Sequence, residues 1–220
     1  MVVCMAEAYH PSYHRSDRHD SAIVRVTHED ALLTYVAWLR GINVGGNSMI
    51  PMGQLVGVFE ELGLRNVRSY INSGNIIFDA SAGSRTKLSA RIEAAIERRF
   101  NLKPMVVLST ATEVRDLVAE LERLSAADRP IRVNVIFLGA GIDNAGIVDR
   151  LPLNPGVDDV TYIPGAIIWR APLAEVGRSR MTRLVGTPTY KQMTVRGANT
   201  VIKVGAIVRL REEAAPSPTV

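Results

Sequence analysis

The sequence predicts an α+β protein made of two tandem ferredoxin-like units, that is, α/β plaits with the order β-α-β-β-α-β. Strand-like runs rich in Val, Ile, Tyr and Trp alternate with segments whose apolar residues have helical spacing. Two strand-like runs follow one another as a hairpin in the middle of each half, and this order of elements occurs twice. We expect the units to span residues 32–110 and 111–212.

The first unit is expected to contain, in chain order, a strand at 34–40, a helix at 51–63, strands at 66–71 and 75–80, a helix at 86–100 and a strand at 104–109. Pro51 suits the first turn of the first helix, and Gly63 is a typical helix stop. The sequence NSGN between the two middle strands is a hairpin signal. The second helix carries its apolar residues on one face, which is typical of a helix packed on a sheet.

The second unit is expected to contain a connecting helix at 110–124, a strand at 131–138, a short helix at 142–151, a hairpin at 159–171, a helix at 178–186, a strand at 191–195 and a last helix at 199–210. Thr110 and Glu113 have the spacing of a capping box at the start of the connecting helix. The hairpin turns at Pro164 and Gly165. The repeat is one of element order, because the two halves share little sequence identity.

The two ends of the chain lack the patterns of a packed domain. Residues 1–31 are polar and without periodicity, which predicts a disordered N-terminal tail, and residues 213–220 are expected to be a flexible tail. No apolar run is long enough to span a bilayer, and the start of the chain lacks the regions of a secretory signal. The single cysteine, Cys4, forms no intrachain disulfide. We therefore expect a cytoplasmic protein that makes no membrane contact.

The positions of the reactive residues limit the chemistry. Cys4 and all four histidines precede residue 30, so the folded part holds no Ser-His-Asp triad, no thiolate nucleophile and no metal cluster of His and Cys. A cluster at 10–19 contains three of the histidines, but no strand or helix frames it, and we predict no metal site. Whether the protein is an enzyme stays open, and neither a catalytic residue nor a cofactor can be named.

The first candidate binding site follows the strand at 34–40. In a ferredoxin-like sheet the first and third strands are antiparallel neighbours, so the end of one lies beside the start of the other. This places the loop at 40–48 next to the hairpin at 72–75, with Lys103 at the same end of the sheet. Glycines let the backbone approach a ligand, and exposed N–H groups bind anions. The alternative is a structural turn, in which Arg40 pairs with a carboxylate and NSGN is only a tight hairpin.

Three better-known kinds of site are excluded. Residues 41–48 imitate a P-loop, but Asn47 stands at the lysine position and a hairpin follows. Residues 139–146 imitate a dinucleotide fingerprint, but Asn144 replaces its third glycine, so we expect a turn. We do not expect specific nucleic-acid binding, because Tyr35 and Trp38 lie on opposite faces of their strand and form no stacking platform.

The second candidate site is the sequence TVRGANTVIK at 194–203. Arg196 follows a strand, and Asn199 or Thr200 can cap the last helix. Together with Lys203 these residues could form an anion-compatible patch at a helix N-terminus. The simpler interpretation is an ordinary helix start, and it is favoured because Lys203 lies a turn inside the helix.

Several stretches together resemble a known bacterial family. YVAWLRGINVGGNSMIPM, LGLRNVRSYINSGNIIFDA, ARIEAAIERRF and TVRGANTVIK are similar to the domain-of-unknown-function family 1697, over about residues 34–210. The resemblance implies tandem α/β plaits and brings no activity with it. Two departures concern the motifs: Asn47 replaces a common lysine, and Gly197 and Ala198 replace a bulkier pair. The matching positions, which we take as the candidate ligand-binding residues, are Arg40, Gly41, Asn43, Gly45, Gly46, Ser73, Gly74, Asn75, Arg196, Asn199, Thr200 and Lys203.

Three functional hypotheses follow. The first is a binding protein whose Gly-rich loop and NSGN hairpin hold a small anionic or nucleotide-like ligand, with Arg40 supplying charge; the net charge of +4 is compatible with this. The second is an enzyme without His or Cys that uses Arg40 beside a carboxylate or Tyr70. The third is a structural or assembly role, in which sheet edges or faces make a homo-oligomer.

Overall fold

The structure, a computed structural model, describes residues 32–43, 50–125 and 130–214 and contains two four-stranded antiparallel sheets. The first sheet has the order β2-β3-β1-β4 and the second the order β6-β7-β5-β8. The strands are β1 (Leu32–Arg40), β2 (Arg65–Tyr70), β3 (Asn75–Ser81), β4 (Met105–Thr110), β5 (Ile131–Leu138), β6 (Asp159–Ile163), β7 (Ala166–Pro172) and β8 (Met193–Gly197). The mixed helix and sheet content confirms the α+β class. All eight predicted strands are present, and the two sheets have equivalent strand orders.

Helices precede, connect and follow these strands. They are α1 (Met52–Glu61), α2 (Arg85–Phe100), α3 (Ala111–Ser125), α4 (Pro188–Lys191) and α5 (Ala198–Ala214). The predicted capping box at the start of α3 is confirmed, because Thr110 Oγ1 accepts from Glu113 N and Glu113 Oε2 accepts from Thr110 N. The last helix continues to Ala214, which is beyond the predicted end at 210 and takes in the first two residues of the predicted flexible tail. The N-terminal tail at 1–31 and the last six residues lie outside the described part of the chain.

Two predicted helices of the second unit are wrong in type. The helix expected at 142–151 is the 3₁₀ helix η2 (Ala145–Arg150), and the one expected at 178–186 shrinks to the 3₁₀ helix η4 (Met181–Leu184). A further 3₁₀ helix, η3 (Leu173–Arg178), and the short α4 were not predicted. Each segment is only about a turn or two long, and such segments gain too few hydrogen bonds to offset helix nucleation, so tight turns replace them.

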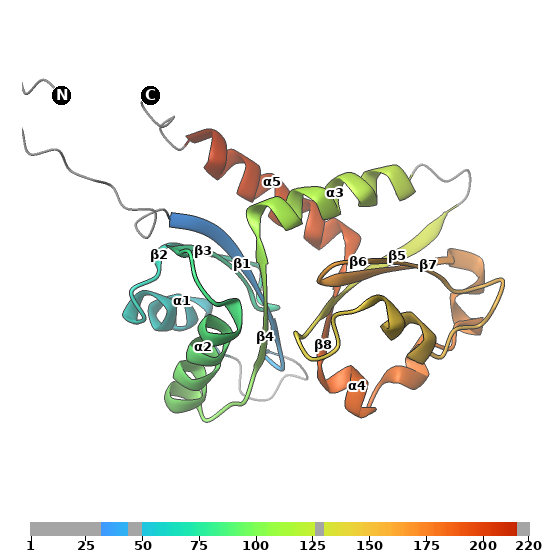
Figure 1. Ribbon diagram of the computed structural model, residues 1–220, viewed down its shortest axis with the longest axis horizontal. Coiled ribbons are helices and arrows are strands. Elements are labelled where there is room, and N and C mark those ends of the chain that lie inside the picture. Colours follow the sequence, from blue (N-terminus) through green and yellow to red (C-terminus); the bar gives the residue numbers. More distant parts are fainter. Residues whose placement is uncertain (1–31, 44–49, 126–129, 215–220) are drawn as a thin grey trace, which may run out of the picture.

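Three apolar layers hold the fold together. The outer face of the first sheet packs against α1 and α2, and Tyr35, Phe59 and Phe78 lie in this layer. The inner face packs against α3, α5 and the second sheet, and Trp38 lies there, which confirms that Tyr35 and Trp38 face opposite ways. The far face of the second sheet is covered by η2, η4 and the neighbouring turns. Figure 1 shows α3 and α5 crossing above both sheets, so the two units share one central core.

Two close contacts lie in the central core, one between the units and one between two helices of the second unit. The rings of Trp38 and Phe137 stack at 4.1 Å between centroids with an interplanar angle of 14°. In the helical layer, a Cβ at Gly205 of α5 would lie 2.6 Å from Cγ2 of Val118 in α3, so the helices can approach this closely only because position 205 has no side chain. The units therefore pack on each other directly over the inner face of the first sheet.

Candidate functional site

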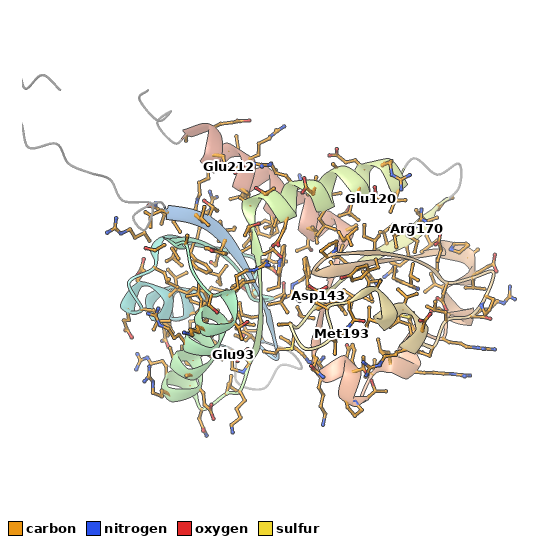
Figure 2. The ribbon with its side chains drawn as sticks, viewed as in Figure 1. Glu93, Glu120, Asp143, Arg170, Met193 and Glu212 are labelled. Carbon is orange, nitrogen blue, oxygen red and sulfur yellow. The ribbon has the colours of Figure 1, made fainter. Side chains whose placement is uncertain are left out.

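The inner face of the first sheet has two ends with different polar chemistry. We call the end that holds Arg40 and Asn75 the loop end, and the end that holds Leu32 and Asp79 the groove end. In Figure 2, Met193 marks the neighbourhood of the loop end and Glu212, in the last turns of α5, that of the groove end. The sequence predicted a site at the loop end.

The strands meet at the loop end as predicted. Trp38 pairs with Asn75 at the start of β3, and Arg40 pairs with Met105 at the start of β4. The end of β1 therefore lies beside the starts of both neighbours. Two of the predicted ligand-binding residues, Gly45 and Gly46, lie outside the described residues.

Arg196 is the most enclosed charged group of the loop end, with 8% of its surface exposed. Its side chain leaves β8 and enters the turn of the first unit, where Nη2 donates to the carbonyls of Leu39 at 2.6 Å, Ser73 at 2.8 Å and Gly74 at 3.2 Å. Nε donates to Oδ1 of Asn75 at 2.5 Å. The guanidinium of Arg196 thus binds residues that lie more than a hundred positions earlier in the sequence.

The remaining nitrogen of Arg196 is used within its own strand. Nη1 donates to Oγ1 of Thr194 at 2.9 Å and to the carbonyl of Val195 at 2.8 Å. All three nitrogens therefore have oxygen acceptors, and no carboxylate within the described ranges forms an ion pair with this side chain. Burial lowers the pKa of Arg196 to about 10, which still leaves it a cation at neutral pH. It holds the units together as a buried, hydrogen-bonded charge.

Arg40 reaches across the interface in the opposite direction. Its Nη1 donates to the carbonyl of Met193 at 2.9 Å and to that of Tyr190, and its guanidinium carbon lies 4.2 Å from the centroid of the Tyr190 ring. The structural alternative considered from the sequence supposed a carboxylate partner, but the partners are carbonyls and an aromatic face. We call Arg40, Arg196 and the carbonyls that they bind the clamp.

The other polar residues of the loop end also have internal roles. Asn43, with φ of 54°, accepts at Oδ1 from Ile50 N at 2.6 Å and donates from Nδ2 to the carbonyls of Ile50 and Asn72. It thus joins Ile50 to the hairpin residue Asn72. Asn75 donates to the carbonyl of Tyr70 at 3.0 Å and to Oγ of Ser73 at 3.1 Å.

Glycine is required at two of the predicted positions for conformational reasons. Gly41 has φ of +80° and Gly74 has φ of +76°. A Cβ at Gly74 would also lie 2.9 Å from Cβ of Leu39, while Leu39 N donates to the Gly74 carbonyl at 2.8 Å. The sequence suggested that glycine lets a ligand approach the backbone here. In the structure, the group that approaches Gly74 is strand β1.

The C-terminal candidate residues separate. Arg196 is buried in the clamp, whereas Asn199 and Lys203 are exposed on α5 and Thr200 is half-buried. No side-chain hydrogen bond or ion pair among the described residues involves Asn199, Thr200 or Lys203, and none joins them to Arg196. The structure therefore gives no common partner to the four members of this predicted patch.

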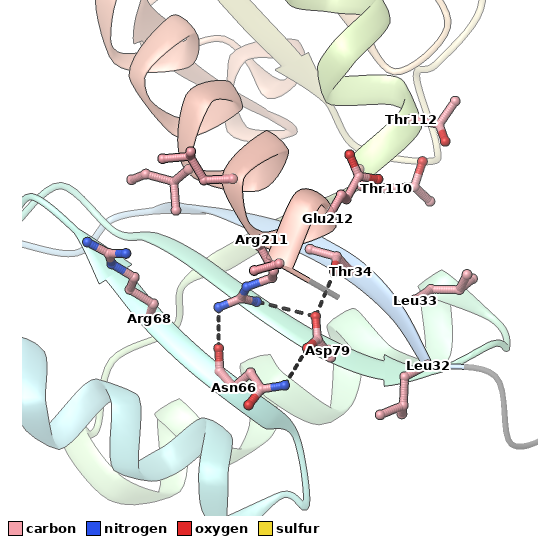
Figure 3. Close-up of a pocket in the computed structure, with 14 residues that line it drawn as sticks. Leu32, Leu33, Thr34, Asn66, Arg68, Asp79, Thr110, Thr112, Arg211 and Glu212 are labelled. Atoms are coloured by element: carbon pink, nitrogen blue, oxygen red, sulfur yellow. Dashed lines mark hydrogen bonds and ion pairs between the residues drawn. The ribbon is translucent and has the colours of Figure 1, made fainter. Parts of the chain in front are cut away.

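At the groove end, the same sheet face is open. A groove of about 850 Å³ lies between the beginnings of β1 and α3, the outer part of β2 and β3, and the last turns of α5 (Figure 3). Its lining residues, which define what we call the groove, are Leu32, Leu33, Thr34, Asn66, Arg68, Asp79, Thr110, Ala111, Thr112, Ile207, Leu210, Arg211, Glu212 and Ala214.

A hydrogen-bond network around Asp79 forms the polar part of the groove. The carboxylate, in a residue only 8% exposed, accepts from Oγ1 of Thr34 and from Nδ2 of Asn66, both at 2.7 Å, and pairs with Nη1 of Arg211 at 3.3 Å. Arg211 also donates to the carbonyl of Asn66 (Figure 3). Asn66 can take part because β2 shifts register between Arg65 and Arg68 and Asn66 has φ of 51°.

All charged side chains that line the groove form ion pairs within the described structure, except one. Arg211 neutralises Asp79, and Glu212 pairs with Arg115 at 2.7 Å. Arg68, an exposed side chain on β2, has no ion pair or hydrogen bond within the described part of the chain. The groove therefore carries one uncompensated cation beside an internally satisfied network.

Aliphatic side chains complete the groove. Leu32, Leu33 and Leu210 are 43%, 41% and 61% exposed, and they are three of the six large apolar side chains that the described structure leaves exposed. Exposed apolar side chains that line a hollow together with placed polar groups are typical of a binding site. Sequence reasoning missed this site, although the signal was an aspartate within the apolar strand run NIIFDA, where aspartate is disfavoured.

The described residues contain neither a candidate metal cluster nor a candidate membrane-spanning helix. They contain no group of three or more His, Cys, Asp or Glu side chains that could hold a metal ion. A search of the same residues finds no helix with the length and apolar character needed to cross a bilayer.

Comparison with known proteins shows similarity to a protein family and to a solved structure. The family described as "Protein of unknown function (DUF1697)" matches residues 32–169. The structure of the conserved bacterial protein SP0830 from Streptococcus pneumoniae is similar with a TM-score of 0.69 and 27% sequence identity, over 81% of this chain and 99% of that chain. No curated protein matches. Since the family match spans well over half of the sequence, the protein belongs to the DUF1697 family, to which no function is assigned.

Proposed function

We propose that the protein binds a small amphipathic anion in the groove, with the apolar part of the ligand on the exposed leucines and its anionic group at Arg68. The single observation that carries this proposal is the unpaired guanidinium of Arg68 in a groove whose other charged groups are paired internally. An anionic ligand would complete the pairing, and a guanidinium binds carboxylate or phosphate oxygens in a two-pronged arrangement.

The size and composition of the groove support this ligand class. A volume of about 850 Å³ lies within the roughly 300–1,000 Å³ range of small-molecule sites. The apolar side chains of Leu32, Leu33 and Leu210 are in contact with water when the groove is empty, so covering them adds favourable free energy. The network of Asp79, Thr34 and Asn66 fixes the polar wall in advance, which lowers the ordering cost of binding.

The test is a thermal-shift and calorimetric screen of the full chain with straight-chain and aromatic carboxylates and their phosphate analogues. A ligand at a hundred times its dissociation constant adds about 2.7 kcal/mol of stability. We expect Arg68→Gln to weaken binding at least about tenfold, whereas Arg99→Gln, at an exposed position on α2 outside the groove, leaves it unchanged. Binding that is equally strong in both variants, or absent throughout the screen, would refute the proposal.

A second candidate function keeps the anion site predicted at the loop end. The observation that favours it is that Arg40 uses only Nη1 within the described structure, so Nε and Nη2 have no protein acceptor there. A small anion bound by these groups would need Arg40 but not Arg68, and the same screen with Arg40→Gln separates the two sites. The enzyme and assembly hypotheses gain no comparable observation.

The finer fold assignment belongs with this proposal. We infer that each unit is a ferredoxin-like plait, with the second unit replacing α-helices by 3₁₀ turns. The strand orders β2-β3-β1-β4 and β6-β7-β5-β8 support this, since both place the first strand of the unit between the third and fourth.

A further inference from the structure

A second hollow, on the opposite side of β1 from the groove, has a strongly one-sided charge. It has a volume of about 600 Å³ and is bounded by the turn from α1 to β2, the connection from β3 to α2, and the first turns of α2. We call it the basic pocket; its lining residues are Leu32, Leu62, Gly63, Leu64, Arg65, Ala80, Ser81, Ala82, Gly83, Ser84, Lys87, Leu88 and Arg91.

Three cations and no carboxylate line the basic pocket. Arg65 comes from the start of β2, and Lys87 and Arg91 come from α2, one helical turn apart. None of the three forms an ion pair within the described part of the chain, and the one hydrogen bond that their side chains make there is from Nη2 of Arg91 to the carbonyl of Leu62 at 3.3 Å. Three unpaired cations around one hollow repel one another, and an anion between them relieves this repulsion.

The charge of the whole first unit points the same way. Residues 32–110 contain nine Lys and Arg against five Asp and Glu, a net charge of +4, so this unit alone carries as much positive charge as the complete chain. Of the other charged residues near α2, Arg85 pairs with Glu113 and Lys103 with Glu97, whereas Arg98 and Arg99 form no ion pair within the described residues. The basic pocket therefore lies in a unit with an excess of positive charge, and it gathers three of the cations that form no ion pair within the described residues.

We propose that the basic pocket binds a phosphorylated small molecule through a phosphate or pyrophosphate group. A multiply charged anion suits three cations better than a single carboxylate does, and the two guanidinium groups can each bind two phosphate oxygens. The hydroxyls of Ser81 and Ser84 line the same hollow and can add hydrogen bonds, and the volume leaves room for a small organic group. The site shares only Leu32 with the groove and does not depend on the function proposed there.

The test is isothermal titration calorimetry of the full chain with sodium pyrophosphate and, separately, with inorganic phosphate and citrate, at low ionic strength. We expect pyrophosphate to bind more tightly than phosphate, and citrate to bind weakly. Arg65→Gln, Lys87→Gln and Arg91→Gln should each weaken pyrophosphate binding about tenfold, which corresponds to about 1.4 kcal/mol.

Arg98→Gln provides the matched control, because Arg98 is an exposed residue of the same helix that does not line the pocket, and the variant changes the net charge by the same amount. It should change the affinity less than about twofold. No heat with pyrophosphate, or an equal loss of affinity in Arg98→Gln and the three pocket variants, would overturn the proposal. Nucleic-acid binding that Arg98→Gln and Arg91→Gln weaken equally would likewise overturn the proposal. It would show a general attraction to positive charge and not binding in the pocket.

Discussion

The loop end and the groove end of one sheet face show how the surroundings of an arginine decide its role. At the loop end, Arg196 donates to the carbonyls of Leu39 and Ser73, to Oδ1 of Asn75 and to further acceptors, and its guanidinium has no donor left for a ligand. At the groove end, Arg211 fulfils the equivalent joining role between α5 and the sheet, and Arg68 remains unpaired beside it. The comparison teaches that polar residues gathered at one rim can hold the two units together, while the binding site that we propose lies where one cation is left without a partner.

The largest effect should come from removing the centre of the clamp. Arg196→Ala removes the Nη2 hydrogen bonds to the carbonyls of Leu39, Ser73 and Gly74 and leaves the buried Leu39 carbonyl with only the hydrogen bond from Thr194 Oγ1 at 3.5 Å. We expect a loss of about 3 kcal/mol or more in the free energy of unfolding. Urea denaturation measures this loss. Arg132→Ala, at an exposed position in β5, serves as control and should stay within about 0.5 kcal/mol of the wild type. Similar losses in both variants would mean that the loss of stability does not come from the hydrogen bonds of Arg196 in the clamp.

The next effect concerns the backbone around the clamp. Gly74→Ala places a Cβ against Leu39 at a positive φ, and it should cost about 2 kcal/mol. Gly53→Ala, in α1 with open space around it, should instead stabilise the protein by about 0.5–1 kcal/mol. Differential scanning calorimetry of both variants gives the comparison, and a neutral Gly74→Ala would show that the hairpin can move away from β1.

Arg40 should matter less than Arg196, because it is only half-buried. Arg40→Ala removes hydrogen bonds to Met193 and Tyr190 and a cation–π contact, for an expected loss of about 1–2 kcal/mol. Tyr190→Leu removes only the aromatic contact and should cost about 0.5–1 kcal/mol. A larger loss for the tyrosine variant, measured by urea denaturation, would place the main contribution of this residue outside the clamp.

The smallest effect on stability is expected at the groove. Arg68→Gln breaks no ion pair of the described structure, so the unfolding free energy should change by less than about 0.5 kcal/mol. The same variant should lose ligand affinity, which is the opposite of the behaviour of the clamp variants. A loss above about 1 kcal/mol would show that Arg68 supports the fold and would remove the contrast between the two ends.

Much of the fold was accessible from the sequence because its signals are local. The strand pattern, the NSGN hairpin and the capping box of Thr110 and Glu113 depend on residues within a few positions of one another, and the structure confirms each. Two helices of the second unit, expected at 142–151 and 178–186, were mispredicted because helical spacing over a few residues does not reveal whether the segment is long enough to form an α-helix.

The site was harder to predict because its determinants are not local. The sequence placed Arg40, Asn43 and Asn75 at one end of the sheet, and the structure brings them there. It could not show that Arg196, more than a hundred positions away, would enter the same turn, because the relative placement of the units depends on packing between α3, α5 and both sheets. Nor could it show that a register shift in β2 turns Asn66 towards Asp79.

The most direct test of the account is a double-mutant cycle between Arg196 and Asn75, measured by urea denaturation. The Nε to Oδ1 hydrogen bond joins the two units, so Arg196→Ala, Asn75→Ala and the double variant should show a coupling energy of about 1 kcal/mol or more. Additive effects within about 0.3 kcal/mol, together with loss of an anionic ligand in Arg196→Ala, would contradict the account and return Arg196 to the binding role that its sequence suggested.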